Sequence, residues 1–228
     1  MILQHGLLKI LLEINMRERV KTDPLNRHPK ELPYYIKLHG SVVETMHEEA
    51  KRIFEFMKSD KRFHADPGTY MAPDEQRWKI LRDKFPIAWE FKEQFDMTNT
   101  IVFLEFNNPE TYSHRPHTHN TNSGTGLFFT IKHSNYAGTA FYEPKQENVD
   151  VVRHVLDNGT LFEAEDCHDT EPVEIVQMTE PHVIALNSFH NPIIIEEHPD
   201  NFNRVTMNWS SRMGFLEFAK KVSSYARN

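Results

Sequence analysis

The chain of 228 residues contains a single cysteine, Cys167, so it forms no internal disulfide and a disulfide-stapled secreted scaffold is excluded. It lacks any run of about eighteen apolar residues, so we expect no membrane span. Basic residues are outnumbered, 26 against 33 acidic ones, and the net charge of -7 argues against a broad nucleic-acid surface. The first twenty residues lack a basic leader followed by a cleavage site, which favours a cytoplasmic protein.

Several common catalytic motifs are also missing. The sequence contains no glycine-rich phosphate loop, no serine-nucleophile elbow and no protein-kinase motif set. It contains no internal repeat and no low-complexity tract. What it does contain is core material, because 39% of its residues are hydrophobic and 16 are Phe. This length and composition predict one domain, residues 1–228, around a sizeable core.

Residues 1–97 are predicted to be a helical support region. In residues 41–60 the apolar side chains recur at three- and four-residue steps, which predicts an amphipathic helix. A second helical stretch over residues 74–95 contains Pro86, where we expect a kink or a new helix to begin. Residues 63–73 between them contain Pro and Gly and are predicted to be a loop.

Residues 98–228 have the pattern of a β unit. Short runs of β-type residues alternate with turn residues and have no crossover helices between them, which favours a sandwich, jelly roll or barrel. A long polar stretch at about residues 144–180 predicts a surface insertion. The predicted strands are residues 100–106, 126–132, 139–142, 173–178, 183–187 and 204–210.

Three histidines are placed where they could bind a metal ion. On an extended backbone, side chains two residues apart share a face, so His117 and His119 project together and His114 projects to the other side. Two imidazoles on one face can bind one ion, and His190, which follows the apolar strand 183–187, is the best candidate for a further ligand. A His-x-His pair also arises by chance in a chain with 14 His, and a structural role is the alternative.

A strand near the C-terminus alternates polar and apolar residues. If its apolar face packs on helices, Arg204 is buried beside a hydroxyl group and needs an anion, and a guanidinium grips a carboxylate at two points. The alternative is a half-exposed edge strand. The polar positions are Arg204, Thr206, Asn208 and Ser210, and the apolar ones are Val205, Met207 and Trp209.

The order of these features resembles the 2-oxoglutarate- and Fe(II)-dependent dioxygenases, and most closely their prolyl 4-hydroxylase-like branch. Residues 106–120 are similar to that branch's aromatic strand, turn, Tyr and His-x-Asp, and residues 136–141 to its glycine hairpin. Residues 186–190 are similar to its distal-His strand, and Arg204-x-Thr206 to its carboxylate-binding pair. Pro116-His117-Thr118 is also similar to a motif of aspartyl/asparaginyl hydroxylases. The resemblance spans about residues 100–211.

This resemblance implies a mainly β fold with N-terminal helices, a double-stranded β-helix (jelly roll, cupin-like) braced by helices. It implies an enzyme that hydroxylates a peptide side chain or an amino-acid-like substrate. Fe(II) would be held by His117, His190 and His119, and Arg204 and Thr206 would hold the far carboxylate of 2-oxoglutarate. Tyr112 and Tyr142 would hydrogen-bond this cosubstrate, or else serve as packing aromatics.

One position departs from the family pattern. The family usually has an acidic residue two positions after the first His, where this chain has His119. Three alternatives follow: a three-His iron site that activates oxygen, a site in which water takes the place of His119, or an inactive site. The corresponding alternatives are a catalytically degenerate binding or assembly module, and a three-His cupin dioxygenase that does not use 2-oxoglutarate. The stretch from Asp166 to Asp169 is interpreted as part of the polar insertion and not as a metal cluster.

Overall fold

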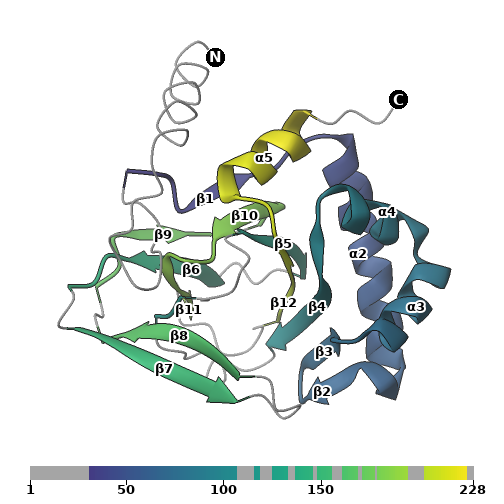
Figure 1. Cartoon of the computed structure of the whole chain (residues 1–228), viewed down its shortest axis with the longest axis horizontal. Helices are drawn as coiled ribbons and strands as arrows, with labels where there is room; N and C mark the ends of the chain where they lie inside the picture. The colour runs from purple at the N-terminus through teal and green to yellow at the C-terminus, as the bar shows by residue number, and fades with distance from the viewer. Residues whose placement is uncertain are drawn as a thin grey trace.

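The computed structural model describes residues 31–106, 116–118, 125–132, 137–145, 148–155, 161–168, 171–177, 179–194 and 203–224. The described chain is mainly β. Helices cover one face of a large antiparallel sheet, and smaller sheets lie on its other side (Figure 1). No helix among the described residues has the length and apolar character needed to cross a membrane.

The helices follow the apolar spacing of the sequence. Helix α2 (Ser41–Ser59) buries the predicted apolar stripe and confirms the amphipathic helix. Helix α3 (Glu75–Lys84) begins where the Asp74 carboxylate accepts the Arg77 N–H, and Pro86 begins α4 (Pro86–Gln94) as a separate helix. Helix α5 (Phe215–Ser224), which the sequence analysis did not predict, packs beside β10 and β5 at the C-terminal end.

The large sheet has seven strands in the order β1-β10-β5-β12-β4-β3-β2. Three of them precede residue 97, so the region predicted as helical support also contributes strands. Residues 63–73, predicted as a loop, include the hairpin of β2 and β3. The strands are β1 (Tyr35–Lys37), β2 (His64–Asp66), β3 (Thr69–Ala72), β4 (Met97–Phe106), β5 (Thr125–Lys132), β10 (His182–Ala185) and β12 (Arg204–Ser211).

The second sheet has the strand order β11-β6-β9, formed by β11 (Phe189–Ile194), β6 (Ala137–Tyr142) and β9 (Glu174–Val176). Within the predicted insertion at 144–180, β7 (Val149–Val155) and β8 (Leu161–Cys167) pair as an antiparallel hairpin. The polar insertion is therefore partly regular structure. Its last part, β9, belongs to the second sheet.

The main core lies between the helices and the large sheet. Strand β12 is central in that sheet, between β5 and β4. The alternative interpretation of this segment as a half-exposed edge strand is therefore wrong. Its residues Val205, Met207 and Trp209 are buried against the helices. Trp209 stacks on Trp78 of α3 with ring centroids 5.3 Å apart. The opposite face of β12 therefore turns toward the second sheet.

Candidate functional site

His117 and His190 are brought side by side by backbone pairing. The His117 N–H donates to the His190 carbonyl at 3.1 Å, and the His190 N–H donates to the His117 carbonyl at the same distance. Residues that exchange both bonds are directly opposite each other, so their side chains share one face. Their ring centroids are 5.2 Å apart. The sequence prediction that these two distant histidines meet is thus consistent with the geometry.

The His190 ring has a defined hydrogen-bond partner. Its Nδ1 lies 2.9 Å from the Ser188 carbonyl, which can only accept, so Nδ1 carries the proton. Nε2 is then the basic nitrogen, the form in which a histidine binds a metal ion while its other nitrogen donates to a carbonyl. His190 is buried, with 5% of its surface exposed, whereas His117 is half-buried.

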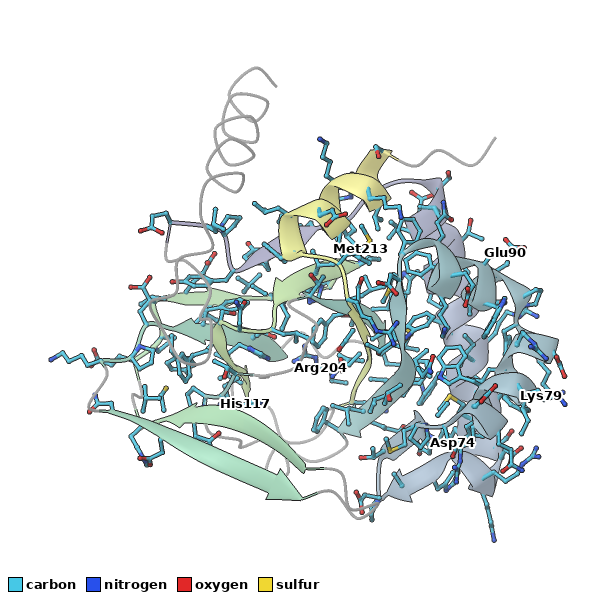
Figure 2. The ribbon with its side chains drawn as sticks, viewed as in Figure 1. Asp74, Lys79, Glu90, His117, Arg204 and Met213 are labelled. Carbon is cyan, nitrogen blue, oxygen red and sulfur yellow. The ribbon has the colours of Figure 1, made fainter. Side chains whose placement is uncertain are left out.

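The face that carries the two imidazoles turns toward the large sheet. Phe141 of β6 lies directly opposite His190 of β11, so the two residues share a face. Phe141 shares an apolar cluster with Ile184 of β10, and Phe128 of β5 packs against that cluster; both residues belong to the large sheet. In Figure 2, His117 is labelled beside β8 and β11, and Arg204 is labelled nearer to β12.

Arg204 crosses from the large sheet to the second sheet. Its side chain leaves β12 on the face opposite the helices, and Nη1 donates to the Gly138 carbonyl of β6 at 3.1 Å. Burial lowers the pKa of Arg204 to about 10 because desolvation disfavours the charged form. A cation in such low-dielectric surroundings attracts an anion strongly.

Two more polar residues of β12 share this face with Arg204. Thr206 is 4% exposed and lies opposite Thr130 of β5. Asn208 follows two residues later, and its buried Oδ1 has no hydrogen-bond partner among the described residues. The alternation predicted for this strand therefore places a guanidinium, a hydroxyl and an amide between the sheets.

The imidazole pair and the guanidinium are separated along β6. Arg204 binds the Gly138 carbonyl, whereas His190 lies opposite Phe141, three residues further along the strand. Three residues of a β-strand span about 10 Å. The imidazole pair and the guanidinium are therefore about 10 Å apart in the direction of the strand.

Tyr142 lies elsewhere, and the structure corrects its predicted place. It is opposite Phe189, so it occupies the face of the second sheet that is turned away from His190. There it packs with Cys167 and hydrogen-bonds Asn191, and burial raises the pKa of its hydroxyl. The register makes Tyr142 a packing aromatic, which is the alternative role.

The other predicted residues, His119 and Tyr112, lie outside the described residues. Within the part of the chain that the structure describes, no three His, Cys, Asp or Glu side chains form a group that could hold a metal ion. The described ligand candidates are therefore the two imidazoles. The sequence analysis missed a carboxylate beside them: Asp166 lies directly opposite His117 in an antiparallel bridge.

No protein-family model and no curated protein matches this sequence.

Proposed function

We propose that the chain is an Fe(II)- and 2-oxoglutarate-dependent oxygenase that hydroxylates a peptide side chain or an amino-acid-like substrate. The observation that carries this proposal is the pairing of His117 with His190 by two mutual backbone hydrogen bonds. The pair faces the same space between the sheets as the buried guanidinium of Arg204. A metal-binding imidazole pair opposite a carboxylate-binding cation is the arrangement that this chemistry needs.

The strand order supports a double-stranded β-helix as the fold. In the large sheet, the spatial order includes β10, β5, β12 and β4 as successive neighbours. In the second sheet, residues 116–118 lie beside β11, which is followed in space by β6 and β9. Each sheet thus interleaves early strands with late ones. A hairpin of chain that winds back on itself as a jelly roll produces such an order.

The residues of this chain fit the two cofactors. His117 and His190 would hold Fe(II), with His119 as the expected third ligand, and Arg204 with Thr206 would hold the far carboxylate of 2-oxoglutarate. When bound, these cofactors with O₂ convert a substrate C–H group to C–OH, while 2-oxoglutarate becomes succinate and CO₂. The protein orients both molecules and excludes water by burying Arg204, Thr206 and His190.

The side chain of Asn208 supports the proposal that the substrate contains an amide group. Its buried Oδ1 is an acceptor without a donor among the residues described, on the same face as Arg204 and Thr206. Leaving a buried acceptor unsatisfied costs about 1–3 kcal/mol, so a ligand N–H or O–H that reaches it gains affinity. Peptide and amino-acid groups carry such donors.

The test is spectroscopic. We expect anaerobic protein with Fe(II) to develop a weak visible charge-transfer band only when 2-oxoglutarate is also added. Arg204→Ala should raise the 2-oxoglutarate concentration for half-maximal absorbance at least tenfold, because a hydrogen bond to a charged group contributes about 1.5–3 kcal/mol. Arg212→Ala is the matched control, since Arg212 is exposed and pairs with Asp96 at the end of β12.

The other outcomes identify the alternatives. Metal uptake without any response to 2-oxoglutarate contradicts the proposal and favours a three-His cupin dioxygenase, in which Arg204 would hold the substrate instead. A folded protein that takes up no metal contradicts it in favour of a binding or assembly module.

A further inference from the structure

The hairpin of β7 and β8 is attached to the short segment that carries His117. The Cys167 N–H donates to the Pro116 carbonyl at 2.8 Å, and His117 forms an antiparallel bridge with Asp166. On its other side the same short segment, residues 116–118, pairs with β11 through His190. The segment is therefore held between the hairpin and the second sheet.

This pairing aligns three side chains in one row. The bond between Cys167 and Pro116 joins the residues that flank the bridge, so His117 and Asp166 are a non-hydrogen-bonded pair. Such pairs have Cα atoms about 4.5 Å apart and their side chains project to the same face. Since His190 is directly opposite His117 on the other side, Asp166, His117 and His190 lie on adjacent strands and share a face.

The residue after Asp166 gives an independent check on that face. Cys167 is 1% exposed and packs with Tyr142 and Phe189, on the face turned away from His190. Because successive residues of a strand point to opposite faces, Asp166 points to the face of the two imidazoles. Asp166 is half-buried there.

We propose that Asp166 is the carboxylate ligand that completes a metal site with His117 and His190. This inference rests on the function proposed above and names its third ligand. Two imidazoles and one carboxylate are the ligand set of non-haem Fe(II) oxygenases. Here the carboxylate comes from the inserted hairpin, on a strand beside the first His, instead of two residues after it.

The neighbouring carboxylate has a different role. Asp150 of β7 lies opposite Asp166 in the hairpin, one strand further from His117. It is exposed, and its Oδ2 lies 2.6 Å from Nε2 of His168. Asp150 is thus paired at the surface, which leaves Asp166 as the carboxylate adjacent to the imidazoles. Because no three His, Cys, Asp or Glu side chains among the described residues are grouped to hold an ion as they stand, this assignment requires the Asp166 side chain to rotate toward His117, and such rotations take picoseconds to nanoseconds.

The test measures metal affinity, not turnover. Titrating the full-length protein with Mn(II), followed by electron paramagnetic resonance of the free ion, should give a dissociation constant that rises at least tenfold in Asp166→Asn. Losing even a residue that only supports a ligand costs 10–100-fold in metal affinity. Asp150→Asn is the matched control and should stay within about twofold. Asp166→Glu keeps the carboxylate and should retain most of the affinity, which separates ligand loss from damage to the hairpin.

The outcomes distinguish the two levels of the proposal. If His119→Ala abolishes Mn(II) binding and Asp166→Asn does not, the Asp166 assignment is overturned while the oxygenase proposal stands. If His117→Ala and His190→Ala also bind Mn(II) like the wild type, both proposals fail. If Asp166→Glu binds as weakly as Asp166→Asn, the effect came from disturbing the hairpin, and the assignment is rejected.

Discussion

At the scale of single residues, burial changes the pKa of a histidine. His182 of β10 stacks on Phe128, with ring centroids 5.6 Å apart, and its Nδ1 donates to the Glu180 carbonyl at 2.7 Å. Burial lowers the pKa of His182 to about 4, with a smaller contribution in the same direction from Lys37. The native state therefore holds this ring neutral, whereas the unfolded state binds a proton below pH 6.5.

We predict that His182 makes the protein acid-sensitive. Because the folded pKa lies below the unfolded one, stability is lost as the pH falls from about 6.5 toward 4, by about 2 kcal/mol between pH 7.5 and 5. Urea unfolding at these two pH values, followed by circular dichroism, should reveal this loss, and His182→Gln should reduce it. His39→Gln is the control, since His39 is exposed. An unchanged loss in His182→Gln contradicts the prediction.

At the scale of elements, alternation within a strand was readable from the sequence. The side chains of β12 point as expected, because a two-residue period with large apolar residues on one side fixes which face packs on helices. The choice between Phe141 and Tyr142 was not readable. Both are aromatic neighbours, and only the register of β6 with β11 decides which of them faces His190.

Elements that are stabilised by distant partners were also not predicted from the sequence. Strand β8 lies in a polar stretch that resembles a loop, and its contact with residues 116–118 is long-range. Strand β11 contains Pro192, which weakens a strand prediction, although it pairs with β6 along its whole length. Strands β1 to β3 have only three or four residues each, too few to show a period. The position of Asp166 opposite His117 could not be predicted without these pairings.

The hairpin of β2 and β3 leads to a prediction about its turn. Gly68 has a φ of 77°, and a Cβ there would lie 2.5 Å from the Glu105 carbonyl oxygen. Gly68→Ala should therefore destabilise the protein by about 1–3 kcal/mol in urea unfolding, since a non-glycine residue in this conformation is strained. Gly214→Ala is the matched control, because a Cβ at Gly214 meets nothing within 4 Å, and its change should stay under about 1 kcal/mol. Equal effects of the two variants would contradict this explanation.

At the scale of the whole molecule, aromatic contacts join the helices to the large sheet, and those of Trp209 reach two helices. Trp209 of β12 stacks on Trp78 of α3, lies 6.1 Å from the Phe91 ring of α4, and donates from Nε1 to the Thr98 carbonyl at 3.0 Å. Its side chain is 1% exposed. A residue with these contacts should contribute strongly to the cohesion between the two layers.

We predict that Trp209→Ala lowers the free energy of unfolding by about 3–5 kcal/mol, as expected for removing a buried Trp. Trp209→Phe, which keeps an aromatic ring, should lose less. Chemical denaturation followed by circular dichroism measures both variants. Lys220→Ala on the exposed side of α5 should change stability by no more than about 0.5 kcal/mol. A small effect of Trp209→Ala would mean that the helices and the sheet are held together by other contacts.

The two faces of β12 have a consequence for how this protein can evolve. Substitutions at Arg204, Thr206 and Asn208 alter the chemistry between the sheets, while Val205, Met207 and Trp209 anchor the same backbone from behind. Selection for new ligands can therefore act on one set of positions and leave the anchoring set intact. Among relatives that bind different ligands, we therefore expect variable and conserved positions to alternate along this strand with a period of two residues.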